Sequence, residues 1–344
     1  MTTVFLSGAS GYIGKHIALE LLNAGYHVRA SVRNVAKRDE VISALRAHVA
    51  NPTLVDTHLS FVELDLSSDD GWNEALIGVD ALLHTASPFT VGSVKDENEL
   101  IRPAVDGTLR ALRAAHGAGV RRVVVTSSVA AIQGRELPAG KIAFDETLWT
   151  DVDAPEGVDP YTKSKTLAEQ AAWEFVATSA PEMQLTTINP SLVLGAPLDR
   201  NFGTSVAVLE RVLAAKDPAL PDVSFSIVDV RDVAALHVRC IEMPETYGER
   251  FIAASESLSF LEMAALLKRA YPRRKIVTRK APKLLLRILA LFDGQIKAIL
   301  PSIGKRTLVD STKAQRTFSM TFITPEVSVI ETATFLLNEA PSIS

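Results

Sequence analysis

Three side chains, those of Ser128, Tyr161 and Lys165, could together move a proton to or from a substrate oxygen. Asp159 and Pro160 predict a helix start, because an aspartate N-cap followed by proline suits a first helical turn. Tyr161 and Lys165 are four residues apart on that helix and project from one face. A nearby ammonium would lower the pKa of the phenol from about 10. We therefore expect Tyr161 as general acid or base, supported by Lys165, with Ser128 bonding the substrate oxygen.

A glycine-rich turn opens the chain. Residues 7–14 read SGASGYIG directly behind the apolar run 4–6. Gly8 would make the turn, Gly11 would let a pyrophosphate approach the backbone, and Gly14 would let the next helix pack closely. The N-terminus of that helix offers unpaired N–H groups to the phosphates. An ordinary glycine-rich turn is the alternative, but the helix pattern and second strand that follow favour dinucleotide binding.

The end of the second predicted strand carries cations. Arg33 follows the strand and Lys37 stands four residues later. An NAD site usually has an acidic side chain here for the ribose 2′-hydroxyl, and this chain has none. Arg33 could form a bidentate contact with a 2′-phosphate, and Lys37 could add a point charge. We expect NADPH/NADP+ over NADH, although a solvated charge cluster at a helix start would look the same.

Two further strand ends should reach the same edge of the sheet. Asp65 and Leu66 end the third strand, where Asp65 could accept a hydrogen bond from adenine or could cap a helix; both interpretations stay open. The fourth strand ends in His84, which we interpret as a core residue. The small side chains after it suit close approach to a cofactor, and they are Thr85, Ala86 and Ser87.

Alternating strand and helix patterns predict an α/β fold, a Rossmann-type doubly wound parallel sheet with a smaller, mostly helical C-terminal lobe. Strands are expected at 3–7, 27–32, 60–65, 79–86, 121–127 and 185–190. Helices are expected near 12–24, 36–49, 70–77, 95–117 and 160–178, and later at 203–215, 231–242, 259–270, 283–298 and 324–338. We place a dinucleotide-binding domain at 1–195 and a substrate lobe at 196–344, with about 225–242, including a strand at 225–228, returning to the main sheet.

Composition narrows the class of protein. The 344 residues are 47% hydrophobic and carry a formal net charge of −4, which gives no electrostatic case for nucleic acid or an anionic membrane. No apolar run approaches the roughly 18 residues that span a bilayer. The single cysteine, Cys240, lies in an apolar helical stretch and is expected in the core. We expect a cytoplasmic protein that binds no metal.

Six stretches of the sequence resemble those of the extended short-chain dehydrogenase/reductases, in the group of dihydroflavonol reductases, cinnamoyl-CoA reductases and yeast-type aldehyde/ketone reductases. The resemblance runs from the first residues to about 272. The matching segments are SGASGYIGKHIALELLNAGYHVRASVRN at 7–34, HTASPF at 84–89, RRVVVTSSVAAI at 121–132, YTKSKTLAEQAAWEF at 161–175, INPSLVLG at 188–195 and VDVRDVAALH at 228–237.

The resemblance implies roles position by position. Ser128, Tyr161 and Lys165 fall on the catalytic serine, tyrosine and lysine of that group. The implied cofactor-binding residues are Gly8, Gly11, Tyr12, Ile13, Gly14, Arg33, Lys37, Asp65, Leu66, Thr85, Ala86, Ser87, Lys165, Pro190, Ser191 and Val193. Many short-chain reductases add a catalytic asparagine after strand four, but residues 103–108 contain none, so that role is not assigned.

The expected function is NADPH-dependent reduction of an aldehyde or ketone to the alcohol. A substrate pocket is expected at Phe89, Val129, Ile132 and Phe202, whose apolar character favours a hydrophobic or aromatic carbonyl compound, although each could equally be a core residue. A sugar-nucleotide epimerase or dehydratase, a hydroxysteroid dehydrogenase and a non-catalytic NADPH sensor remain alternatives. We expect a monomer or a homodimer, and residues 279–305 could be a lid, a dimer face or a surface helix.

Overall fold

A computed structural model describes residues 2–87, 96–154, 158–291 and 300–338. Its centre is a seven-stranded sheet in the order β3-β2-β1-β4-β5-β6-β9, in which each strand runs parallel to its neighbours. The strands are β1 (Thr3–Ser7), β2 (His27–Val32), β3 (Leu59–Glu63), β4 (Ala81–His84), β5 (Arg122–Thr126), β6 (Gln184–Pro190) and β9 (Glu249–Ala253). The strand order reverses between β1 and β4, so the expected Rossmann-type doubly wound fold is confirmed.

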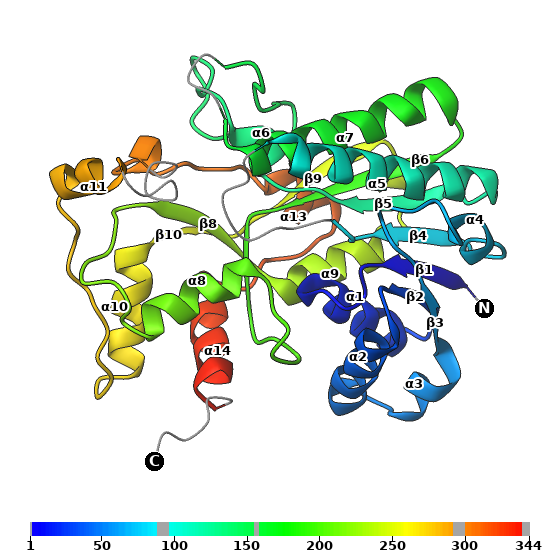
Figure 1. Cartoon of the computed structure of the whole chain (residues 1–344), viewed down its shortest axis with the longest axis horizontal. Coiled ribbons are helices and arrows are strands. Elements are labelled where there is room, and N and C mark those ends of the chain that lie inside the picture. The colour runs from blue at the N-terminus through cyan, green and yellow to red at the C-terminus, as the bar shows by residue number, and fades with distance from the viewer. Residues whose placement is uncertain (1, 88–95, 155–157, 292–299, 339–344) are drawn as a thin grey trace.

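Helices cover both faces of this sheet because its strands are apolar on both sides. On β1, Val4 and Leu6 enter one core and Phe5 enters the other. The first core contains α1 (Tyr12–Asn23), α2 (Val35–His48) and α9 (Val230–Arg239). The second contains α4 (Trp72–Ala75), α5 (Asn98–Gly117) and α7 (Pro160–Ser179). Figure 1 shows these two groups on opposite sides of the sheet.

A second, three-stranded sheet lies beyond β6, in the order β10-β8-β7. It contains β7 (Leu192–Leu194), β8 (Ser224–Asp229) and β10 (Ser257–Ser259). Its core is shared with α8 (Thr204–Leu213), α10 (Phe260–Ala270) and α14 (Pro325–Asn338). The remaining short helices are α3 (Thr53–His58), α6 (Ala130–Gln133), η1 (Pro244–Thr246), α11 (Lys283–Leu289), η2 (Leu300–Ser302) and α13 (Thr312–Thr317).

One sequence expectation about connectivity was wrong. The strand expected at 225–228 does not return to the main sheet, because β8 pairs with β7 and β10 instead. Helix α9, which follows it, does pack against α1. The strand that returns is β9, a short segment after the Gly248 turn, pairing with β6. The domain boundary at 195 stays a prediction.

Local signals explain where several elements begin and end. Asp159 caps α7 as expected, its carboxylate accepting from the Thr162 backbone N–H at 3.1 Å. The helix expected at 70–77 shortens to α4 because Gly71 and Gly78 both adopt positive φ. Helix α11 ends at Leu289 instead of continuing to 298, and 292–299 lie outside the described residues. Cys240 directly follows α9 and is fully buried, as expected.

A very close backbone contact joins α1 to the end of β1. A Cβ on Gly14 would lie 2.2 Å from the Gly8 carbonyl oxygen, and one on Gly8 would lie 2.7 Å from the Ala86 nitrogen. Gly8 also has φ of +74°, which disfavours any other residue. Helix and strand therefore approach one another more closely than a methyl group allows.

We expect Gly14→Ala to lower the free energy of unfolding by about 1–3 kcal/mol, because the new methyl group must push backbone away from backbone. Gly117→Ala is the matched control, since Gly117 ends α5 and a methyl group there would meet no atom within 4 Å. It should be neutral or stabilise by up to about 1 kcal/mol. Urea unfolding of both variants checks this, and equal effects would contradict the close-approach argument.

Candidate active site

The three candidate catalytic side chains meet at the carboxyl edge of the main sheet. Ser128 lies just beyond β5 and is 9% exposed, while Tyr161 and Lys165 lie on the first turns of α7. A side-chain hydrogen bond joins Ser128 and Tyr161. The Lys165 Nζ lies 6.0 Å from the centre of the Tyr161 ring. The structure therefore brings together the residues that sequence spacing singled out.

The electrostatics of this group differ from the simple expectation. Burial raises the pKa of Tyr161, and the hydrogen bond with Ser128 opposes that rise only in part. Burial also lowers the pKa of Lys165 to about 8, and its Nζ donates to Ser87 Oγ at 3.1 Å. The pKa of Tyr161 is therefore raised overall by burial, opposite to the expected lowering.

A cavity of about 350 Å³ lies over the glycine turn, and we call it the glycine-turn cavity. Eight of the expected cofactor-binding residues line it: Gly8, Gly11, Arg33, Lys37, Leu66, Thr85, Ala86 and Ser87. The Ser7 hydroxyl organises its floor, accepting from the backbone N–H groups of Thr85 and Ala86 at 3.1 and 3.2 Å. The other partner of that hydroxyl is His84 Nδ1 at 2.8 Å. Burial lowers the pKa of His84 to about 3, which fits its expected place in the core.

This cavity has the features that a dinucleotide needs. Helix α1 begins at Tyr12, and its N-cap residue, Gly11, has no side chain that could cap it, so the first N–H groups of the helix face the turn without a competing side chain. Arg33 and Lys37 line the cavity at the end of β2. The Lys37 ammonium pairs with Glu40 at 2.8 Å, an exposed contact that a phosphate could replace at small cost.

Sequence reasoning missed the loop after β7. Asn201 lines the glycine-turn cavity and donates to the Ser10 carbonyl oxygen at 3.1 Å. Nearby, Asp199 pairs at 2.5 Å with Lys15, whose side chain is almost fully buried. The other missed lining residues are Ser10, Ser31, Val32, Leu64 and Trp72. No local motif marks residues 199–201. The one signal that could have pointed to them is Lys15, a lysine on the buried face of α1 that needs an acidic partner.

Several expected cofactor residues do not line this cavity. The Tyr12 hydroxyl donates to the Gly195 carbonyl oxygen at 2.7 Å, and Gly14 packs behind the turn. Asp65 caps a turn, not a helix, by accepting from the Ser67 backbone N–H at 2.8 Å, which corrects one of its two interpretations. The remaining five, Ile13, Lys165, Pro190, Ser191 and Val193, are likewise absent from the lining. The buried Ser191 hydroxyl has no hydrogen-bond partner among the described residues.

The proposed substrate contacts are mainly packing residues in this structure. Val129 is 7% exposed and Ile132 is fully buried, both in a small core with Phe144. Phe202 packs against the main core, and Phe89 lies outside the described residues. Their roles as substrate contacts stay predictions.

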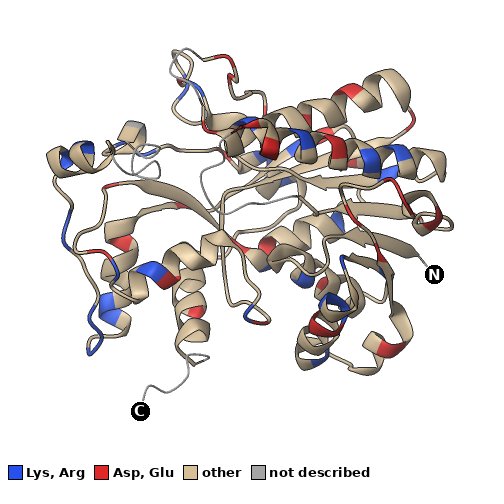
Figure 2. Ribbon diagram, in the orientation of Figure 1, with Lys and Arg blue, Asp and Glu red and all other residues tan. Residues whose placement is uncertain are grey.

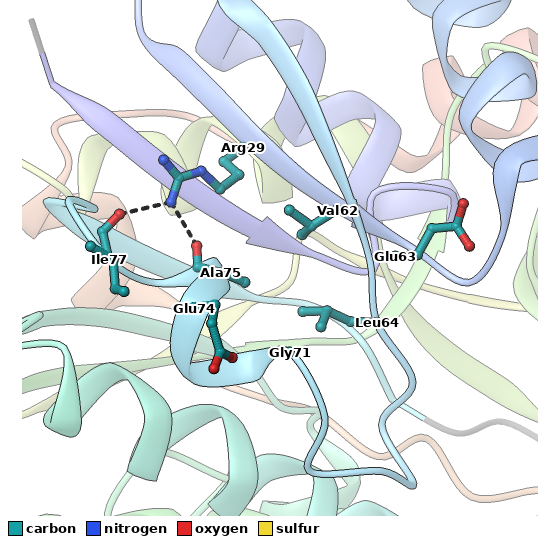
Figure 3. Close-up of a pocket in the computed structure, with 8 residues that line it drawn as sticks. All are labelled: Arg29, Val62, Glu63, Leu64, Gly71, Glu74, Ala75 and Ile77. Carbon is teal, nitrogen blue, oxygen red and sulfur yellow. Dashed lines mark hydrogen bonds between the residues drawn. The ribbon is translucent and has the colours of Figure 1, made fainter.

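A larger hollow of about 570 Å³ lies between the β2–β3 side of the sheet and α4 (Figure 3). Arg29 is its main polar group, and its guanidinium donates to the carbonyl oxygens of Ala75 and Ile77 at 2.8 Å each. The charged neighbours are Glu63 and Glu74, and none of the three candidate catalytic residues lines it. Arg29 therefore holds α4 and the turn after it against the sheet.

A doubly wound sheet with a glycine turn at its switch point and a serine, tyrosine and lysine at the same edge is the arrangement of the short-chain dehydrogenases/reductases. The model of the NAD-dependent epimerase/dehydratase family matches residues 4–253. The chain belongs to this family, the extended branch of those enzymes.

Named relatives fall in the reductase group of the family. A bifunctional dihydroflavonol 4-reductase/flavanone 4-reductase of Malus domestica is 32% identical over 80% of this chain and 78% of its own length. Cinnamoyl-CoA reductase 1 of Arabidopsis thaliana is 32% identical over 80% and 77%. The crystal structure of yeast methylglyoxal/isovaleraldehyde reductase complexed with NADPH is 25% identical, covers 98% of both chains and has a TM-score of 0.80. The resemblance drawn from the sequence is confirmed.

Within the described ranges, no helix combines the length and apolar character required to cross a bilayer.

Removing the half-buried Lys165 ammonium should stabilise the fold. Because burial lowers its pKa from 10.5 to about 8, the unfolded chain holds the extra proton between those values. The buried ammonium therefore lowers the free energy of unfolding by its full amount below about pH 8, and this destabilisation diminishes as the pH rises towards 10.5. We expect Lys165→Met to gain roughly 1–3 kcal/mol at pH 7, with a smaller gain at pH 10.

Urea unfolding at the two pH values measures this gain. Lys163→Met is the matched control, since its ammonium pairs with Glu97 at 2.9 Å and should change stability by less than about 1 kcal/mol. A Lys165→Met variant no more stable than wild type at pH 7 would show that burial does not strain the ammonium.

Proposed function

We propose that this protein is an NADPH-dependent reductase that converts an aldehyde or ketone to the alcohol. The observation that carries the proposal is the cluster of Ser128, Tyr161 and Lys165 beside the glycine-turn cavity. Lys165 links the two directly, because its ammonium reaches Ser87, a residue that lines the cavity. The relatives named for dihydroflavonols, cinnamoyl-CoA and small aldehydes all reduce carbonyl groups by their names, which supports the same reaction class here.

NADPH is the proposed cofactor because cations, and no acidic side chain, directly follow β2. Arg33 can form two parallel hydrogen bonds with a 2′-phosphate, and Lys37 can exchange Glu40 for the same group. The yeast relative crystallised with NADPH supports this choice. When bound, NADPH supplies the hydride.

The protein residues then manage the oxygen and its proton. Ser128 and Tyr161 hold the carbonyl oxygen, whose negative charge grows as the carbon is reduced. Tyr161 donates its proton to that oxygen, giving the alcohol and a phenolate that is reprotonated from solvent. The Lys165 ammonium stabilises this phenolate, and the raised pKa of Tyr161 keeps the phenol protonated before reaction.

A hydrophobic or aromatic carbonyl compound is the proposed substrate class, and we place the enzyme in the cytoplasm as a monomer or homodimer with no nucleic-acid partner. The charge distribution supports the last point. Figure 2 shows both signs interspersed over the helices, and the net charge is −4.

Tyr161→Phe tests the function directly. Without the phenolic proton, reduction should fall by about 10²–10⁴-fold, while NADPH binding should change less than about threefold. NADPH consumption is measured against aromatic aldehydes, α-diketones, β-keto esters, dihydroflavonols and hydroxycinnamoyl thioesters, with NADH alongside. Tyr271→Phe, whose hydroxyl contacts Thr334 in the second lobe, is the control and should keep full activity. A Tyr161→Phe enzyme with most of its activity would contradict the assignment, and tightly held NAD without net consumption would indicate an epimerase.

Arg33→Gln tests the cofactor preference. Losing a charge-assisted bidentate contact should weaken NADPH binding by about 10–100-fold and leave NADH binding almost unchanged. Arg38→Gln is the control, because that guanidinium is exposed and contacts Asp39. Fluorescence titration with both nucleotides reports the result. Equal losses for NADPH and NADH would mean that Arg33 does not contact the 2′-phosphate.

A further inference from the structure

A fully buried carboxylate lies one helical turn after Lys165. Glu169 is on α7, four residues beyond Lys165 and eight beyond Tyr161, so all three project from nearly the same face of the helix. Its side chain has no exposed surface. It accepts hydrogen bonds from residues at the end of β5, on β6, on β9 and on α7 itself, namely Ser127, Thr187, Asn189, Arg250 and Trp173.

The contacts divide between the two carboxylate oxygens. Oε2 accepts from Ser127 Oγ at 2.6 Å and from Asn189 Nδ2 at 2.7 Å. Oε1 accepts from Arg250 Nε at 2.7 Å, from Thr187 Oγ1 at 2.9 Å and from Trp173 Nε1 at 3.3 Å. A carboxylate so fully buried loses its hydration, and these hydrogen bonds together with a nearby cation must compensate that cost.

The network extends to the backbone that carries Ser128. Ser127 precedes Ser128 directly, and Asn189 Nδ2 also donates to the Ser128 carbonyl oxygen at 3.1 Å. One carboxylate thus ties the ends of β5 and β6 to the helix that bears Tyr161 and Lys165. Its removal would loosen the serine relative to the tyrosine.

The compensating charge comes mainly from Arg250. This guanidinium donates to the carbonyl oxygens of Glu146 and Leu148 at 2.7 and 2.8 Å and stacks over the Trp149 ring at 3.7 Å. Those contacts hold the guanidinium beside Glu169. Lys165, one turn away, is the second cation that the Glu169 charge favours.

We propose that Glu169 is a positioning residue for the reduction proposed above: it anchors the Ser128 strand end to α7 and keeps the Lys165 ammonium protonated at neutral pH. The inference rests on that proposed function. Among the described residues, the charged and titratable groups facing Lys165 are Tyr161 and Glu169 on α7 and His84 on β4. Arg250 on β9 faces Glu169, and Glu97 near the start of α5 pairs with Lys163. Burial lowers the pKa of Lys165 and Glu169 raises it, whereas His84 is neutral at working pH.

Glu169→Gln separates the charge from the shape of the side chain. The Lys165 titration and the alkaline limb of the reduction rate should both move down by about one pH unit, because an attractive charge is lost. Glu169→Asp keeps the charge and should leave both near their wild-type positions. The titration is read without cofactor, from ¹³C-lysine-labelled protein by NMR, with the Lys165 signal assigned through Lys165→Arg.

Arg122→Gln is the matched control for loss of a buried charged network. Arg122 lies at the opposite end of β5, bonded to the Cys240 carbonyl oxygen and to the hydroxyls of Thr186 and Thr246. It should lower stability without moving the Lys165 titration. A folded Glu169→Gln variant with an unmoved titration overturns the proposal. If that variant does not fold, the wild-type protein is read instead, and a Lys165 side chain that has already lost its proton at pH 7 overturns the proposal.

The turnover measurement and the Lys165 titration test the proposed function and the role of Glu169 separately. Absence of turnover by the wild-type protein on every carbonyl would contradict the proposed function, while the lysine titration still reports whether Glu169 sets the charge of Lys165. Turnover together with an unmoved titration would contradict the positioning role alone.

Discussion

The close approach of α1 to the end of β1 is the constraint on which the rest of the structure depends. Gly8 and Gly14 bring two backbones together where any methyl group would collide. That contact places the N-terminus of α1 beside the glycine-turn cavity, which Gly8 and Gly11 line. Ser7 then fastens the neighbouring strand end to the same point through Thr85 and Ala86. The chemistry-bearing residues meet there because parallel strands all end at this edge.

The same edge combines the glycine-turn cavity with the cluster of Ser128, Tyr161 and Lys165, and hydrogen bonds connect the two. Ser87 contacts Lys165 from the cavity side, while Glu169 holds the opposite end of the cluster through β5 and β6. The Glu169 network is not a surface feature. Its hydrogen bonds join buried side chains, which resist competition from water.

Sequence reasoning succeeded where a local signal determined a local structure. The glycine spacing, the Asp159 cap and the spacing of Tyr161 and Lys165 are read within one turn or one helix, and the structure contains each. It failed where pairing partners are distant in the chain: β8 joined a second sheet, and β9 returned to the first. Asn201 reaches the glycine turn and Asp199 reaches α1, each across more than 180 residues, with no local pattern to mark them. The burial that shifts the pKa values of Tyr161 and Lys165 is likewise a tertiary property, with no local pattern to mark it.

Cys240 gives the molecule a built-in reporter of its own opening. It is the single cysteine of the 344 residues, it is fully buried directly after α9, and burial raises its pKa to about 12. A thiol-modifying reagent can therefore react only when the core between α9 and α1 opens. The labelling rate measures how often that happens in the unmodified protein. Because α1 also carries the glycine turn, the same rate would register whether a bound nucleotide holds this half of the sheet closed.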